Sequence, residues 1–411
     1  MAASSIHGPA MTPPAPAAST RRHDLDWIRV LAFGLLILYH VGMYYVTWDW
    51  HVKSPFASAA LEPLMLATSP WRLALLFLVS GAATAFMLQR PDRPFLGPRS
   101  GRLLLPLVFG MLVVVPPQAY YEVVEALCYG DGYLAFWGRY LAADATFCDA
   151  DGCLIVPTWN HLWFVAYLWV YSVLLWFAHR LLPGTLARGG GWVAARLASA
   201  WGVLLWPALL LAVARVTLAP RFGSTHALVD DWYNHAQYLP VFLLGYWIAQ
   251  ADAVWERLRR LRWPALAISA MSYAFIAWYF GRFDHAHPPA DALRFAQRGI
   301  WAAFQWCTIA AILGFGRQLA PRDSRLLRYL TLAVFPFYIL HQTVIVVLAH
   351  RLQPLGLSPA VEGPLLVVAT FGACLLGYEL IRRVGWLRPL FGLKTLRARA
   401  SAPQAGVEAA G

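Results

Sequence analysis

Two side chains that are costly to place in a membrane lie in the first long apolar run of the sequence, WIRVLAFGLLILYHVGMYYV. Arg29 and His40 are eleven residues apart, with no other charged residue between them. On a helix, this spacing places them on one face, within roughly 20° of each other and roughly 16 Å apart along the axis. Asp26 lies one turn before Arg29 on nearly the same face. Ionisable groups inside a membrane span indicate a functional site, so this column is the first candidate for chemistry.

The two residue types suit the two halves of a group-transfer reaction. A guanidinium binds phosphate through paired hydrogen bonds, so Arg29 is a candidate for holding a phosphate-bearing donor. A histidine in an apolar wall favours its neutral form and can act as a general base on a hydroxyl, which makes His40 the candidate catalytic residue. The structural alternative is that Arg29 extends to lipid headgroups while His40 forms a hydrogen bond with a neighbouring helix.

Further polar side chains recur in later apolar runs. Arg99 and Arg102 stand one turn apart where the third run begins, either as a second phosphate site or as topology signals. His161 and Trp163, within TWNHLWFVAYLWVY, are either part of an interfacial belt or the lining of a carbohydrate site. The same choice between substrate binding and a structural role applies to Arg298 and Gln305, which form a polar helix face. It applies also to the pair of Tyr338 and His341.

The elements that must position these residues are membrane helices. Of the 411 residues, 59% are hydrophobic and 13% are charged, against about 25% charged in an average soluble domain. In the second apolar run, the small residues Ser80–Ala83 favour close helix packing over a reaction by the Ser80 hydroxyl. Runs long enough to cross a bilayer predict an all-α, polytopic membrane protein with about ten transmembrane helices. These fall at 27–47, 68–89, 103–121, 160–178, 197–214, 238–250, 264–280, 295–316, 329–349 and 363–381.

Ten spans place both termini on one side, and the basic residues indicate which side. The connections on that side and the two tails hold most of the 33 lysines and arginines, whereas the opposite connections hold only Lys53, Arg139, Arg215, Arg221, Arg282 and Arg351. By the positive-inside rule, we expect both termini in the cytoplasm, with Arg29 near the inner interface and His40 slightly beyond the midplane. This topology also explains the net charge of +12, so we expect no nucleic-acid partner.

The sequence divides into a membrane domain and two tails. Residues 1–20 are rich in Ala, Pro and Ser and predict a disordered cytoplasmic tail. We expect the membrane domain at 21–390 and a second cytoplasmic tail at 391–411. Three of the five cysteines lie in the outer connection 122–159, where a Cys148–Cys153 disulfide and three free thiols are both open. The sequence contains no zinc-type spacing of Cys and His, so we predict no metal site.

Several stretches, taken in order, resemble motifs of the acyltransferase-3 family of integral membrane proteins. LDWIRVLAFGLLILYH, with Arg29, ten intervening residues and His40, is similar to the family's first-helix signature. The first span and the WDWHVKSP after it also resemble the branch that includes glucan biosynthesis protein C. The later matches, which extend the resemblance over most of the chain, are FLVSG at Phe77–Gly81, the Arg99/Arg102 stretch before Pro106, HLWF at His161–Phe164 and FYILH ending at His341.

The resemblance implies an O-acyltransferase of the bacterial inner membrane. Such proteins take an acyl group, of acetyl or succinyl class, from cytoplasmic acyl-CoA and deliver it to a carbohydrate on the outer side. The family's essential histidine and arginine correspond to His40 and Arg29. Acyl-CoA is then a co-substrate, and we expect no permanently bound cofactor.

The remaining candidates divide between the two substrates. We expect the CoA phosphates to bind at Arg29 with help from Arg99 and Arg102. The oxyanion of the reaction needs a donor such as His341 or Tyr338. The acceptor site is expected to include these two residues together with His161, Trp163, Arg298 and Gln305.

A different class of protein could use the same residues. A transporter or flippase for a polar solute would use the intramembrane polar groups as its pathway, although no internal repeat supports this class. A signalling or scaffold membrane protein is a third class. The sequence leaves open the acyl group, the acceptor, the formation of an acyl-enzyme and the oligomeric state.

Overall fold

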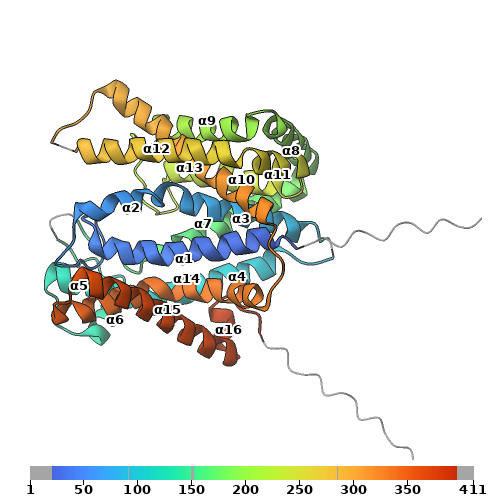
Figure 1. The fold of residues 1–411 in the computed structure, drawn as a ribbon. Helices are drawn as coiled ribbons and strands as arrows, with labels where there is room; N and C mark the ends of the chain where they lie inside the picture. Colours follow the sequence, from blue (N-terminus) through green and yellow to red (C-terminus); the bar gives the residue numbers. More distant parts are fainter. Residues whose placement is uncertain (1–20, 91, 150–151, 285, 396–411) are drawn as a thin grey trace, which may run out of the picture.

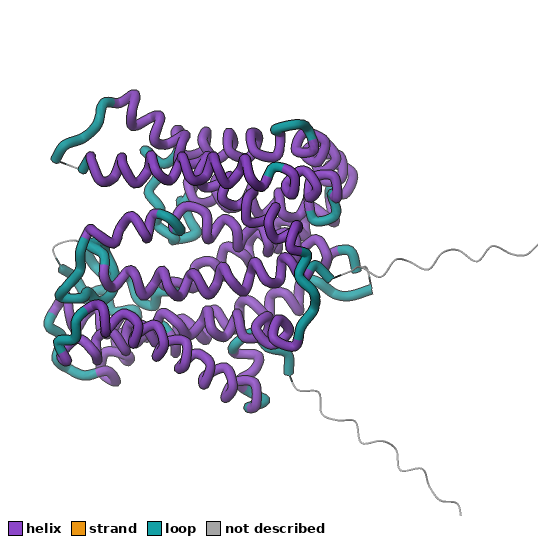
Figure 2. Tube along the Cα trace, viewed as in Figure 1, coloured by secondary structure: helices purple, strands orange, loops and turns teal. Residues whose placement is uncertain are grey.

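The computed structural model describes residues 21–90, 92–149, 152–284 and 286–395, and within these ranges the chain is a helical bundle without strands. This confirms the expectation of an all-α, polytopic membrane protein. The tail expected at 1–20 lies outside the described residues, as does the part of the tail expected at 391–411 that follows residue 395. Figures 1 and 2 show both ends of the described chain at the same end of the bundle, which we call the inner end; the opposite end is the outer end.

Eight helices or helix runs within the described chain are long and apolar enough to cross a membrane. The first span is α1 (His23–Tyr45), and the second is the run of η1 (Ala59–Leu61), α2 (Glu62–Leu66) and α3 (Ser69–Leu88). The third is the run of α4 (Leu96–Phe109), η2 (Gly110–Val114) and α5 (Pro116–Leu127). The fourth is η3 (Asn160–Leu162) with α7 (Trp163–Leu181). The last four are α12 (Arg262–Arg282), α13 (Asp291–Leu319), α14 (Arg325–Leu352) with η4 (Gln353–Leu355), and α15 (Pro359–Arg383).

The expected count of ten is too high by this measure, and the reasons are local. The apolar run expected at 197–214 corresponds mainly to α9 (Gly202–Thr217), which is short for a span by itself. With α8 (Pro183–Ala198), from which it is bent by 114°, it forms at most one further, broken span. The expected sixth span corresponds to α10 (Trp232–Ile248), whose 17 residues reach about 25 Å, short of a hydrocarbon core of about 30 Å. Three short helices complete the fold, namely α6 (Tyr133–Leu141), α11 (Asp252–Arg260) and α16 (Leu387–Leu390).

One face of α1 packs against the bundle, which explains how its polar residues come to face other helices. The helix contacts α14, α13, α3 and α15, and Figure 1 shows it between the helices labelled α12 and α15. Leu31 and Leu38 on its opposite face are exposed. Because Arg29 and His40 lie on the packed face, they can meet side chains from distant parts of the chain instead of lipid.

α3 and α10 approach each other closely, and two glycines permit it. A Cβ on Gly81 would lie 1.9 Å from the carbonyl oxygen of Phe242, and one on Gly245 would lie 2.0 Å from that of Leu78. Any larger residue would push the helices apart, since these contacts are far inside the van der Waals limit. The close packing expected from Ser80–Ala83 is therefore confirmed at Gly81.

Two expectations about the connections can be compared with the structure. Cys148 and Cys153 form a disulfide, and Cys128 is a free, exposed thiol at the outer end of α5, so the alternative of three free thiols is wrong. The packed chain also extends past the boundary expected at residue 390, because Phe391 and Leu393 are buried in the main hydrophobic core.

Candidate active site

The structure brings together two histidines that are 301 residues apart in the sequence. His40 in the outer half of α1 and His341 in α14 approach to 2.9 Å between His40 Nδ1 and His341 Nε2. The other ring nitrogen of His341, Nδ1, lies 2.7 Å from the backbone carbonyl oxygen of Tyr338. This carbonyl ties the His341 ring to its own helix, so the position of His40 relative to α14 is fixed by two consecutive hydrogen bonds.

The second of these hydrogen bonds determines where the protons lie. A carbonyl oxygen can only accept, so His341 Nδ1 carries a proton and donates it to Tyr338. In neutral His341, Nε2 is then an acceptor, and His40 Nδ1 must donate to it. His40 Nε2 is left with a free lone pair. This nitrogen has no hydrogen-bond partner within the described chain, and the His40 side chain is only half-buried, so Nε2 is available to a substrate as a general base.

A polar network extends from this pair toward the outer end of the bundle. The fully buried Gln118 in α5 is its centre, because its side-chain oxygen accepts from Asn160 at 3.1 Å and from Gln342 at 3.0 Å. Its amide nitrogen lies 3.4 Å from Nδ1 of His161. Gln342 Nε2 also donates to Nε2 of His51 at 2.8 Å. The Nδ1 of His51 in turn donates to the Glu122 carboxylate. A continuous chain of hydrogen bonds therefore runs from Glu122 through His51 to Gln342, the residue after His341.

Three expected acceptor-site residues, His161, Tyr338 and Trp163, lie beside this network, and each is already engaged by other residues. His161 Nε2 donates to the Ile339 carbonyl at 3.2 Å, and Tyr338 donates its hydroxyl to the backbone carbonyl of His161. Trp163 is stacked beneath His226, with ring centroids 4.2 Å apart. Burial lowers the pKa of His226, which lies in the connection before α10, so this stacked ring is neutral. Tyr338 and His341 thus have no hydrogen-bond donor left over for an oxyanion.

The other two expected acceptor-site residues, both in α13, are not joined to the histidine pair. Arg298 is half-buried, with its guanidinium carbon 5.7 Å from the ring centroid of Phe295 in the same helix. Gln305 is buried, and its side-chain nitrogen has no partner within the described residues. Neither makes a hydrogen bond to His40 or His341 in the part of the chain that the structure describes.

At the inner end, the structure groups the three expected phosphate-binding arginines. Arg29 interacts with Asp26 at 3.4 Å, but its Nε is buried without a hydrogen-bond partner in the described chain. Arg99 donates from Nε and Nη2 to the Ser172 hydroxyl at 3.2 Å. Arg102 lies close enough to Arg29 and Arg99 to interact electrostatically with both. The positive charges of the three arginines repel one another, so the cluster favours an anionic ligand.

Two cavities adjoin this arginine cluster. One of about 270 Å³ lies against α1 and the inner half of α3 and includes Arg29 in its lining. The other, of about 600 Å³, lies between α4 and the last described residues, and no acidic residue lines it within the described chain. Arg90 borders both cavities, and the larger one is also lined by Arg93, Arg99, Arg102 and Lys394.

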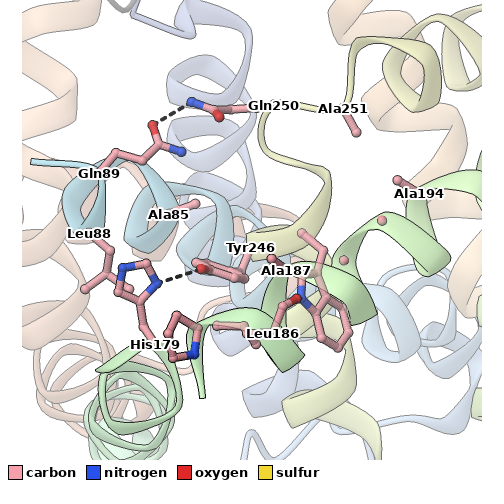
Figure 3. Close-up of a pocket in the computed structure, with 14 residues that line it drawn as sticks. Ala85, Leu88, Gln89, His179, Leu186, Ala187, Ala194, Tyr246, Gln250 and Ala251 are labelled. Atoms are coloured by element: carbon pink, nitrogen blue, oxygen red, sulfur yellow. Dashed lines mark hydrogen bonds between the residues drawn. The ribbon is translucent and has the colours of Figure 1, made fainter. Parts of the chain in front are cut away.

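A third cavity near the inner end provides a contrast. It has a volume of about 380 Å³ and lies between α3, α7, α8 and α10. Figure 3 shows its polar groups, with His179 hydrogen-bonded to the Tyr246 hydroxyl at 3.0 Å and Gln250 donating to Gln89. No charged side chain lines it within the described residues. A phosphate group would find no countercharge there, unlike in the arginine-lined cavity.

Sequence reasoning missed several polar residues near the histidine pair. His51, Gln118 and Gln342 carry no local signal, because they become neighbours only when three distant segments pack together. Arg72 stands in the first turn of the span expected at 68–89, near a membrane interface, where arginine is ordinary. The structure has this helix as α3 (Ser69–Leu88) and buries the Arg72 side chain against Tyr39 of α1, a contact that a single span does not reveal.

Comparison with known proteins adds one match. A family model described as an acyltransferase domain matches residues 22–379, which is most of the chain and includes both histidines and the arginine cluster. Neither the curated proteins nor the solved structures contain a match to the chain.

Proposed function

The chain belongs to the acyltransferase-3 family of membrane acyltransferases, and on that premise we propose that it transfers an acyl group from acyl-CoA at the inner face to a carbohydrate hydroxyl at the outer face. The acyl group is of acetyl or succinyl class. The membrane is the bacterial inner membrane, with both termini in the cytoplasm, because the positively charged connections gather at the end where the termini lie.

The observation that carries this proposal is the hydrogen-bonded pair of His40 and His341. With His40 Nδ1 donating to His341, the lone pair of His40 Nε2 removes the proton from the acceptor hydroxyl. The resulting oxygen forms a bond to the thioester carbonyl carbon, and the carbon–sulfur bond breaks. The proton held by His40 passes to the leaving CoA sulfur, so the products are an ester and free CoA.

The inner end supports the donor half of the proposal. The CoA phosphates bind among Arg29, Arg99 and Arg102, where the structure leaves several basic side chains around cavities with few carboxylates. From there, the thioester arm extends along the Arg29–His40 face of α1, over roughly 16 Å of helix. A long, thin donor arm suits this separation between the phosphate site and the base.

The outer end supports the acceptor half. The network from Glu122 and His51 through Gln118 to His161 supplies polar groups in a region that is otherwise apolar. Trp163 lies beside it, but its ring is buried and stacked on His226, so in the described structure it offers no free face to a sugar ring. We place the acceptor hydroxyl at His40 Nε2, with Arg298 and Gln305 available only to more distant parts of a large acceptor.

The test uses radiolabelled acetyl-CoA and succinyl-CoA, supplied to inverted membrane vesicles that contain the protein. We expect label in the glycan fraction of the vesicle lumen, and we expect His40→Ala to reduce the rate by at least about 10²-fold, in line with the loss of a general base. His287→Ala is the matched control, because His287 is an exposed histidine in the connection before α13. Full transfer by His40→Ala would contradict the mechanism, and solute movement without acylation would favour a transporter.

A further inference from the structure

Arg72, in the first turn of α3, is a membrane-buried cation beside the histidine pair. Its side chain is only 4% exposed, and its Nε has no hydrogen-bond partner among the described residues. Nη1 makes one long contact of 3.4 Å with the Thr68 hydroxyl. No carboxylate lies within ion-pair distance of Arg72 in the described part of the chain, although Arg22 and Arg29 each have an aspartate partner.

The surroundings of Arg72 fix its orientation. The guanidinium carbon lies 3.5 Å from the ring centroid of Tyr39, the residue before His40. A guanidinium stacked on an aromatic face keeps its N–H groups in the plane at its edges, free to donate. Arg72 also lies close enough to His40 and His341 to interact electrostatically with both. Arg72 therefore lies in the neighbourhood of the histidine pair, with donors that the described chain leaves unused.

A purely structural role does not account for this arrangement. A buried charge without a partner destabilises a fold, and an apolar residue of similar size would pack there at lower cost. The stacking on Tyr39 recovers only part of that cost. A cation kept in this position without a countercharge is one that meets negative charge during function.

The negative charge that arises at this point in the proposed reaction is the oxyanion of the thioester. When the acceptor oxygen attacks, the carbonyl π electrons move onto the carbonyl oxygen, and they return when the carbon–sulfur bond breaks. The two donors expected from the sequence are engaged elsewhere, since Tyr338 donates to the His161 carbonyl and His341 Nδ1 to the Tyr338 carbonyl. Resting on the proposed function, we propose that Arg72 is the catalytic residue that stabilises this oxyanion.

The test compares three variants in the vesicle assay with acetyl-CoA and succinyl-CoA. Arg72→Gln should lower kcat by about 10²–10³-fold, the range found when an oxyanion donor is removed, with KM for acyl-CoA changed less than about twofold. Arg72→Lys keeps the charge without the planar fork and should be intermediate. For Arg72→Ala, added guanidinium should restore part of the lost rate. Arg351→Gln, at the exposed outer end of α14, is the control and should match the wild type.

Protein stability provides the second measurement. Because the change removes an unpaired buried charge, Arg72→Gln should melt in detergent at or above the wild-type temperature. A variant that melts well below the wild type and is not rescued by guanidinium would show a structural role instead and would overturn the inference.

Other outcomes separate this inference from the proposed function. If kcat is unchanged while KM rises, Arg72 binds the ground state and not the oxyanion. If only succinyl transfer is lost, Arg72 binds the distal carboxylate of the acyl group. Either result overturns the oxyanion assignment while leaving the acyltransferase intact. If the wild-type protein itself transfers no label, the proposed function fails, and the oxyanion assignment of Arg72 fails with it.

Discussion

At the scale of single residues, the central feature is His40, whose tautomer is set by its hydrogen bond to His341. His341 has no free nitrogen, so its contribution to the site is to hold the ring of His40 with the proton on Nδ1. A base held in the wrong tautomer would present an N–H to the substrate and could not accept a proton. In the proposed mechanism, His341 is therefore a positioning residue, although the sequence places it among the acceptor-binding candidates.

Substituting His341 tests this role. His341→Leu removes the acceptor for His40 Nδ1 and should reduce kcat by about 10²-fold, the lower end of what a positioned base contributes. His341→Gln offers a side-chain oxygen at a similar reach and should retain at least about tenfold more activity than the leucine variant. Steady-state kinetics at fixed pH measure both, with KM for acyl-CoA expected to stay constant because the donor site is at the other end of α1. Equal activity of the two variants would show that the hydrogen bond has no role.

At the scale of elements, the α3–α10 contact positions Arg72, because α3 carries both that residue and Gly81. Gly81→Ala places a methyl group 1.9 Å from the Phe242 carbonyl oxygen and forces the two helices apart. We expect a loss of about 1–3 kcal/mol in the free energy of unfolding, as for other overpacked contacts. The melting temperature in detergent should fall accordingly.

Gly372→Ala in α15 is the matched control for this prediction. An added Cβ there meets no atom within 4 Å, so the change should be neutral or should stabilise the helix by about 0.5–1 kcal/mol. If Gly81→Ala melts at the same temperature as Gly372→Ala, then α3 and α10 do not require the glycine contact.

The elements also show what the sequence could and could not predict. α1 was predicted almost to its ends, because a long apolar run with few charges has only one reasonable structure in a membrane. α8 was not predicted as a helix, since its arginines and its three consecutive glycines are typical of a connection. The helix that carries Arg72 was predicted to within one residue at each end, but the burial of Arg72 against α1 could not be predicted, because it depends on a distant segment.

At the scale of the whole molecule, the orientation in the membrane decides which substrate meets which end. Cys128 is a free and exposed thiol at the outer end, whereas Cys307 and Cys374 are buried and Cys148 and Cys153 are joined. A membrane-impermeant maleimide should therefore label Cys128 in intact cells, and Cys128→Ser should abolish the label. Labelling that requires permeabilised cells would reverse the orientation and place the arginine cluster outside.

The candidate site was only partly accessible to sequence reasoning at this scale. His40, Arg29 and His341 were all identified, the first two from helix spacing and all three from the family resemblance. Their contacts could not be identified, because the His40–His341 bond joins helices that are 301 residues apart. The same limit hides Gln118 in α5, whose side-chain partners come from α14 and η3. Local patterns carry no information about which of several buried amides will meet.

The hydrogen bond from His341 to the carbonyl of residue 338 also has a genetic consequence. The acceptor belongs to the main chain, so replacing the Tyr338 side chain leaves that oxygen in place as long as α14 remains helical. Random mutation can therefore vary the ring at position 338, and with it the packing beside the histidine pair, without changing which nitrogen of His341 carries the proton. Substrate preference can therefore change during evolution while the tautomer of the base, His40, stays the same.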